Sequence, residues 1–147
     1  MGGYRLFSAV LLFIYVAIHA CGANNVTVTL GISVSSQSTS SFLNDNGRAV
    51  LDGLIYFEKV SPNLGITWKN GSSISARVMW KEDYGNSSVV KTNYQDFISD
   101  SNVNFLLGPI STGLSIAARS ITEPADRLLL GTKSGSTSFY LDTRKVY

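Results

Sequence analysis

The sequence predicts an α/β fold, a doubly wound parallel sheet with helices on both faces. Strand-like and helix-like segments alternate along the chain. Because crossovers between parallel strands are right-handed, such an order places helices on both sides of one sheet. In addition, Phe105 to Gly108 is an apolar run without polar alternation, which is typical of a strand buried on both faces.

The amino terminus has the plan of a secretory leader. Arg5 is followed by an apolar run from Leu6 to Ile18, and then by small residues, with cleavage expected after Ala20 or Ala23. We therefore assign residues 1–23 to a signal peptide.

Two other interpretations of this leader stay open. The first is an uncleaved anchor, although the apolar run is shorter than the ~18–20 residues that usually span a bilayer. The second is a bacterial lipoprotein cleavage site at Ile18-His19-Ala20-Cys21, in which His19 stands where a small residue is usual.

The expected mature domain, residues 24–147, is long enough for one small core. It contains neither His nor Cys, because His19 and Cys21 are the sole examples in the sequence. This composition excludes cysteine nucleophiles, Ser-His-Asp triads, ordinary zinc sites and disulfides from the domain. Charge is nearly balanced, because leaving out Arg5 of the leader reduces the 12 Lys and Arg of the full sequence to 11, against 10 Asp and Glu, and no basic stripe suggests nucleic acid. We expect no cofactor and no metal.

Three N-glycosylation sequons lie in the mature part, beginning at Asn25, Asn70 and Asn86. Behind a signal peptide they favour a eukaryotic secretory route and an extracellular or luminal location. Some sequons arise by chance in a chain rich in Ser and Asn, which is the alternative for any one of them.

The first strand is expected at Val26–Val34, which is rich in β-branched residues. A polar stretch follows, and a helix is expected over Gly47–Val60 with its cap at Asn44, Asp45 or Asn46. Pro62 ends that helix. Its sheet-facing side comprises Val50, Gly53, Leu54, Phe57 and Val60.

A second strand is expected over Ile74–Trp80, ending in Lys81-Glu82-Asp83. A second helix opens at Gly85 to Ser88, and its apolar face comprises Val90, Tyr94, Phe97 and Ile98. A short buried strand is expected at Leu128–Gly131. The tail from Phe139 to Tyr147 has no clear period.

The buried run Phe105 to Gly108 ends in a Gly-Pro step, and two hydroxyl residues, Ser111 and Thr112, then stand where a third helix should begin. Either hydroxyl suits the N-cap, and the first backbone N–H groups of a helix attract an anion. Open α/β sheets bind ligands at the carboxyl ends of their strands. The sequence therefore predicts that a small molecule binds here and that the chain does not catalyse a reaction on it. The alternative is that both hydroxyls serve only the helix, which Pro124 breaks or kinks near its end.

Taken together, these segments resemble the amino-terminal half of a type I periplasmic-binding-protein domain. The resemblance covers Val26 to about Leu141 and is strongest at Leu107 to Thr112 and at Ser134 to Ser138. The family includes bacterial branched-chain amino-acid binding proteins and the ligand-binding regions of metabotropic glutamate, GABA type B and natriuretic peptide receptors.

The resemblance implies that residues 24–147 are an incomplete first lobe of a two-lobe domain, from a truncated product or a shortened relative. It places a ligand carboxylate on Ser111 and Thr112, and a ligand ammonium on Gly135, Ser136 and Thr137. The ligand would then be an amino acid or a similar small polar molecule. The second lobe, and any membrane or signalling domain, would lie outside this sequence.

Receptors of this family pair through helices of the first lobe. The resemblance therefore implies a homodimer through Gly47–Val60 and Ser88–Ser99.

Two rival functions remain. An α/β enzyme would use Glu82 and Asp83 at the end of a strand as a base or as metal carboxylates, although neighbouring carboxylates in a loop are more often solvated charge. Gly131-Thr132-Lys133-Ser134 lacks the glycine spacing of a phosphate loop, and no Gly-x-Gly-x-x-Gly or Gly-x-Ser-x-Gly motif occurs. The other rival is a secreted structural or adhesive domain without a ligand.

Overall fold

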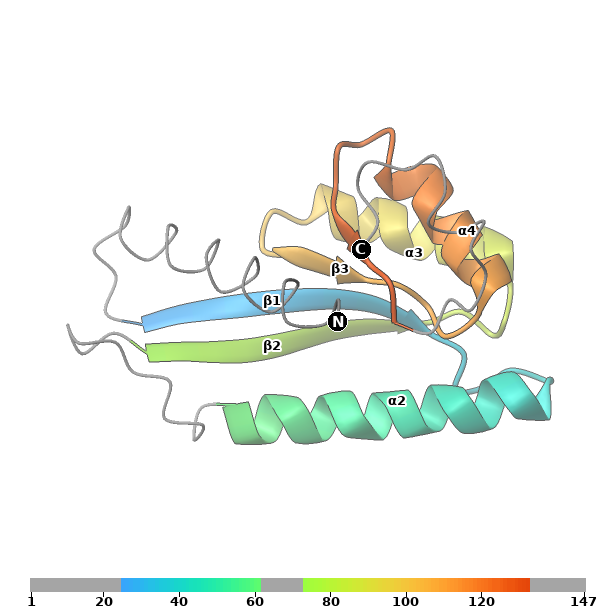
Figure 1. Ribbon diagram of the computed structural model, residues 1–147, viewed down its shortest axis with the longest axis horizontal. Helices are drawn as coiled ribbons and strands as arrows, with labels where there is room; N and C mark the ends of the chain where they lie inside the picture. Colours follow the sequence, from blue (N-terminus) through green and yellow to red (C-terminus); the bar gives the residue numbers. More distant parts are fainter. Residues whose placement is uncertain (1–24, 62–72, 133–147) are drawn as a thin grey trace, which may run out of the picture.

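The computed structural model describes residues 25–61 and 73–132. In this part of the chain, four strands form one parallel sheet in the order β2-β1-β3-β4 (Figure 1). The strands are β1 (Asn25–Val34), β2 (Ser73–Glu82), β3 (Phe105–Leu107) and β4 (Leu129–Leu130), and the helices are α2 (Ser41–Val60), α3 (Ser87–Ser99) and α4 (Thr112–Thr122). The predicted alternation of strands and helices is confirmed.

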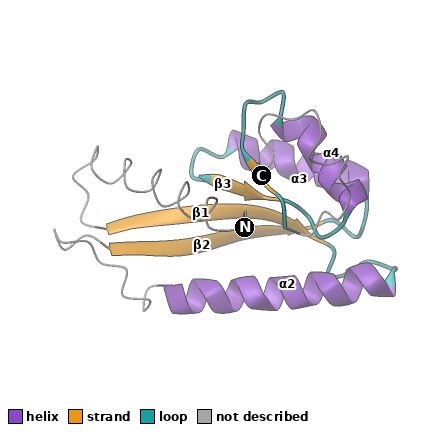
Figure 2. Ribbon diagram, in the orientation of Figure 1, coloured by secondary structure: helices purple, strands orange, loops and turns teal. Residues whose placement is uncertain are grey.

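Helices lie on both sides of the sheet, as predicted. Figure 2 shows β1 and β2 between α2 on one side and the α3–α4 pair on the other. The main core fills the α3–α4 side, where Tyr94 and Phe97 are buried and pack edge to face with ring centroids 5.8 Å apart. The core cluster consists of Val90, Tyr94, Phe97, Val103, Leu106, Leu114, Ala117, Ala118 and Leu129.

A glycine in β1 allows α3 to lie close to the sheet. A Cβ at Gly31 would stand 3.1 Å from Cγ of Phe97 and 3.1 Å from Cγ1 of Val103. A larger residue would therefore push α3 away from the strand, because a packed core has no spare volume.

Helix α2 starts earlier than the sequence indicates, at Ser41 instead of Gly47. Its first turns carry Phe42 and Leu43 among polar residues, and Asn44 and Asn46 donate side-chain hydrogen bonds to the carbonyls of Ser38 and Phe42. The predicted cap at residues 44–46 is therefore wrong, because these residues already lie inside the helix.

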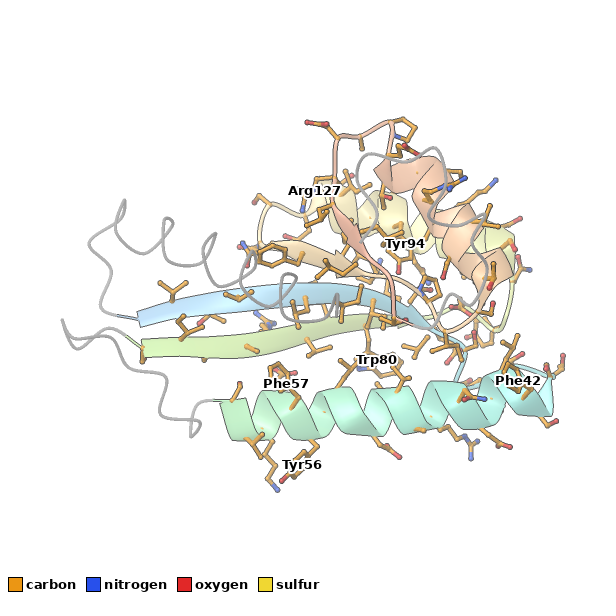
Figure 3. All side chains as sticks on the ribbon, viewed as in Figure 1. Phe42, Tyr56, Phe57, Trp80, Tyr94 and Arg127 are labelled. Atoms are coloured by element: carbon orange, nitrogen blue, oxygen red, sulfur yellow. The ribbon has the colours of Figure 1, made fainter. Side chains whose placement is uncertain are left out.

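The sheet-facing side of α2 is also narrower than predicted. Gly53 is exposed, with nothing within 4 Å of the position that a Cβ would take, whereas a Cβ at Gly47 would meet the backbone of Ser35 at 2.6 Å. Tyr56 and Ile55 are 67% and 51% exposed, and Figure 3 shows Tyr56 pointing away from the sheet. Helix α2 thus covers β1 and β2 while leaving large apolar side chains in solvent.

The end of α2 also closes the outer edge of β2. Oε2 of Glu58 accepts a hydrogen bond from N of Val78 at 3.2 Å, and Oγ of Ser61 accepts one from N of Ala76 at 3.0 Å. An edge strand with free N–H groups invites pairing with another chain. These two side chains occupy that position on β2.

Three predicted segments lie outside the described residues. They are the signal peptide in residues 1–23, the sequon at Asn70, and the second ligand turn at Gly135, Ser136 and Thr137.

Candidate functional site

The strand order creates a topological switch point at the carboxyl end of the sheet. The chain runs from β1 to β2 on one side, and then returns past β1 to β3 on the other side. Loops that follow β1 and β3 therefore diverge to opposite faces. In open α/β sheets, ligands bind at such a switch point.

Ser111 and Thr112 lie at this point, where α4 begins. Ser111 is the N-cap with extended backbone, and its Oγ accepts a hydrogen bond from N of Leu114 at 3.4 Å. Thr112 is the first residue of the helix, and both side chains are half-buried. The N-cap prediction is confirmed for Ser111.

The segment before α4 is firmly held. N of Gly108 donates to the carbonyl of Leu130 at 2.7 Å, and Oγ1 of Thr132 donates to the carbonyl of Gly108 at 2.8 Å. Oγ of Ser115 donates to the carbonyl of Pro109 at 3.0 Å. These bonds fix the direction in which the first turn of α4 faces.

The first turn of α4 carries groups that can bind an anion. The first N–H groups of a helix have no intrahelical acceptor and carry the positive end of the helix dipole. Gly113 is exposed with nothing within 4 Å of a Cβ position, so a small anion has room beside the backbone. Two neighbouring hydroxyls would supply further donors.

Asp83 forms a second polar cluster at the same edge of the sheet, together with Ser33 and Ser35, and this cluster was not predicted from the sequence. Asp83 is 0% exposed, and its carboxylate accepts hydrogen bonds from Oγ of Ser33 at 2.8 Å and from Oγ of Ser35 at 2.5 Å. It also accepts one from N of Gly85 at 2.8 Å. The interpretation of Asp83 as solvated charge is wrong, because three donors replace water around it.

The same network reaches α3 and the loop after β1. Nδ2 of Asn93 donates to Oγ of Ser33 at 3.0 Å, and Oγ of Ser36 donates to Oε2 of Glu82 at 2.5 Å. Glu82 is half-buried at the end of β2 and also accepts from N of Tyr84 at 2.9 Å. Both carboxylates thus hold the strand ends together through hydrogen bonds.

Tyr94 lies beneath this network and is labelled in Figure 3. Burial raises the pKa of its hydroxyl above the ordinary value; the backbone of Ser33 lowers this pKa in part, and the negative charge of Asp83 raises it by a smaller amount than that. The hydroxyl donates to the carbonyl of Leu107 at the end of β3. Tyr94 therefore links α3 to the strand that precedes Ser111.

The pairing register of β1 and β2 could have indicated that the serines after β1 lie beside Asp83. Val34 pairs with Glu82, so Ser35 and Asp83 leave their strands side by side. A parallel pairing of the first two predicted strands, aligned at their carboxyl ends, would have brought the serines to the carboxylate.

Within residues 25–61 and 73–132, no cluster of three or more His, Cys, Asp or Glu residues is arranged to hold a metal ion. Over the same residues, no helix has both the length and the apolar character needed to span a membrane.

No family model matches the chain, and no curated protein matches it. Among solved structures, the chain is similar to the branched-chain amino acid transporter substrate-binding protein LivJ of Streptococcus pneumoniae, in complex with isoleucine. The TM-score is 0.67 at 17% identity, over 83% of this chain and 33% of that one. It is also similar to an ABC transporter substrate-binding protein of Desulfitobacterium hafniense in complex with Leu (TM-score 0.63, 17% identity, 83% and 33% covered). A third is the leucine-binding protein LivK of Thermotoga maritima (TM-score 0.64, 13% identity, 81% and 31% covered).

At these identities the likeness concerns the fold. The described part of the chain is a parallel-sheet α/β unit that matches the first lobe of the type I periplasmic-binding-protein fold. The chain spans about a third of the length of these solved proteins. The predicted fold class is therefore confirmed, and the link to receptor ectodomains stays a prediction.

Proposed function

We propose that this chain is part of a ligand-binding domain that takes a small amino-acid-like molecule at the carboxyl edge of its sheet. Ser111 and Thr112 would hold the ligand carboxylate through their hydroxyls and the first N–H groups of α4. The domain would belong to an extracellular receptor or solute-binding protein that enters the secretory pathway.

The observation that carries this proposal is the position of Ser111, which caps α4 at the topological switch point of the sheet. Hydroxyls and peptide N–H groups can bind a carboxylate without burying a full counter-charge, which would be costly to desolvate. Support also comes from the fold, since solved proteins that share it were determined with isoleucine or Leu bound.

The ammonium of the ligand would be held at Gly135, Ser136 and Thr137, as the resemblance implies. These residues follow β4, which lies beside β3 in the sheet. Both groups of residues thus follow neighbouring strands of one parallel sheet.

A structural or adhesive domain without a ligand is the second candidate. It is favoured by the occupied side chains of the Asp83 network, whose hydroxyls serve the fold. It is also favoured by the large apolar side chains that α2 exposes.

Calorimetric titration of the purified chain with a panel of amino acids distinguishes these functions. Saturable heat without turnover supports the binding function, and consumption of the added molecule supports an enzyme. A folded chain that gives no heat with any member of the panel supports the structural role.

Two substitutions separate capping from binding at Ser111. Asn and Asp are both good N-caps, so Ser111→Asn and Ser111→Asp should preserve α4. The Asp variant places a negative charge against the ligand carboxylate, and we expect at least about a tenfold weaker binding, or ~1.4 kcal/mol. Ser99→Ala, at the far end of α3, is the matched control. Equal affinities for the Asp variant and the wild-type chain would exclude Ser111 from the site.

A further inference from the structure

Asn86 combines a sequon with the N-cap position of a helix. It is the N-cap of α3, and its Oδ1 accepts hydrogen bonds from N of Ser88 at 2.8 Å and from N of Val89 at 3.4 Å. Both cap bonds use the oxygen of the amide. The nitrogen Nδ2, which is the atom that N-glycosylation modifies, is not needed by the cap.

Other asparagines in the described residues use this nitrogen to hold the fold. Nδ2 of Asn44 donates to the carbonyl of Ser38, and Nδ2 of Asn93 donates to Ser33 and to the carbonyl of Glu82. Among residues 25–61 and 73–132, Nδ2 of Asn86 has no hydrogen-bond partner, and residues 86–88 are exposed. A substituent on this nitrogen would extend into solvent without breaking a contact.

We propose that Asn86 is a glycosylated residue of the folded chain, an inference that rests on the secretory route of the proposed function. The bond formed joins Nδ2 to the anomeric carbon of an oligosaccharide supplied by a lipid-linked sugar diphosphate. The bond between that carbon and the diphosphate oxygen breaks, the lipid diphosphate leaves, and Nδ2 loses one proton. Ser88 completes the acceptor sequence through its hydroxyl.

The glycan has a consequence for the ligand edge. Asn86 follows β2 and Ser111 follows β3, so both begin helices at the carboxyl end of the same sheet, on the face that α3 and α4 share. A glycan at Asn86 keeps the first turn of α3 in solvent. A second wall that closes over the ligand must then leave this corner free, and a glycan there would oppose the predicted pairing of two copies through the amino-terminal part of Ser88–Ser99.

The test is synthesis of the full chain with its own leader in the presence of endoplasmic-reticulum microsomes, followed by treatment with an amidase that converts glycosylated Asn to Asp. Peptide mapping then reports each converted position. We expect conversion at Asn86, and a loss of one glycan in gel mobility for Ser88→Ala and for Asn86→Asp. Both variants keep the cap, since Ser88 contributes its backbone N–H and Asp is an equivalent cap.

The possible results distinguish a failure of glycosylation at Asn86 from a failure of the proposed secretory route. A chain protected inside the microsomes but unmodified at Asn86 overturns the glycosylation and leaves the secretory route intact. A chain that stays outside the microsomes overturns both. Conversion at Asn86 with unchanged thermal midpoints for the two variants supports a glycan that the fold accommodates.

Discussion

Replacement of Asp83 should be among the most destabilising single changes in the described part of the chain. Its side chain is fully buried and accepts hydrogen bonds from Ser33, Ser35 and the backbone of Gly85. Asp83→Ala leaves these three donors without an acceptor. An unsatisfied buried donor costs about 1–3 kcal/mol, and water that enters the vacated space recovers part of this, so we expect a loss of about 3–5 kcal/mol in the free energy of unfolding.

Asp83→Asn should destabilise the fold less than Asp83→Ala, because the amide keeps part of the hydrogen bonding. The oxygen at the Oδ1 position must stay an acceptor, because Ser35 and the N–H of Gly85 both donate to it. The new amide nitrogen therefore faces Ser33, whose hydroxyl already accepts from Asn93. The Ser33 hydroxyl can accept from both amides, but its own proton then has no acceptor, so one buried donor is left unsatisfied. The expected cost is about 1–2 kcal/mol.

Urea denaturation followed by far-UV circular dichroism measures both variants, with the midpoint compared at equal slope. Asp96→Ala is the matched control, because Asp96 makes an exposed ion pair with Lys81 at 2.5 Å. Such surface pairs contribute about 0–1 kcal/mol. If Asp83→Ala unfolds at the same urea concentration as Asp96→Ala, the assignment of a structural role to the buried carboxylate is refuted.

Three further predictions concern other parts of the fold. Gly47→Ala places a Cβ 2.6 Å from a backbone carbon and should lower the free energy of unfolding by about 1–3 kcal/mol. Gly53→Ala places a Cβ where nothing lies within 4 Å and should raise the free energy of unfolding by about 0.5–1 kcal/mol. A higher urea midpoint for Gly47→Ala than for Gly53→Ala would contradict this. Burial raises the pKa of Tyr94, so above pH ~10 the unfolded chain releases this proton while the folded chain retains it, and stability should fall as pH rises. Between pH 7 and 11, the free energy of unfolding should fall less for Tyr94→Phe than for the wild-type chain. An identical fall in both chains would count against this prediction. Because Tyr56 on α2 is 67% exposed, we also expect self-association through α2, and Tyr56→Lys should shift it toward monomer in sedimentation; a wild-type chain that is monomeric at every concentration would argue against such pairing.

Much of the fold was predictable because it depends on local patterns. The apolar run at Phe105 to Leu107, the β-branched residues of β1 and the helical spacing on α3 each select an element from its own residues. The cap at Ser111 was likewise predictable from a hydroxyl placed directly before an apolar helical face. The start of α2 was not, because its first turns place Phe42 and Leu43 among polar residues without a sustained helical spacing.

The chemistry of Glu82 and Asp83 could not be predicted from their neighbours in sequence. Two adjacent carboxylates after a strand look the same whether they face water or a buried hydroxyl. The outcome depends on Ser33 and Ser35, which lie far away in the sequence, with a separation of 50 positions between Ser33 and Asp83. Only the parallel register of β1 and β2 brings the two groups together.

The sequence by itself determined where most strands and helices lie, the absence of thiols and imidazoles from residues 24–147, and the hydroxyl turn at Ser111 and Thr112. The tertiary structure decided which polar groups are used to hold the fold and which remain available. Asp83 is enclosed by three donors, whereas Gly113 in the first turn of α4 is exposed at the switch point. Whether a segment forms a helix or a strand depends largely on its own residues. Whether a carboxylate can be buried depends on hydrogen-bond donors that come from distant positions in the sequence.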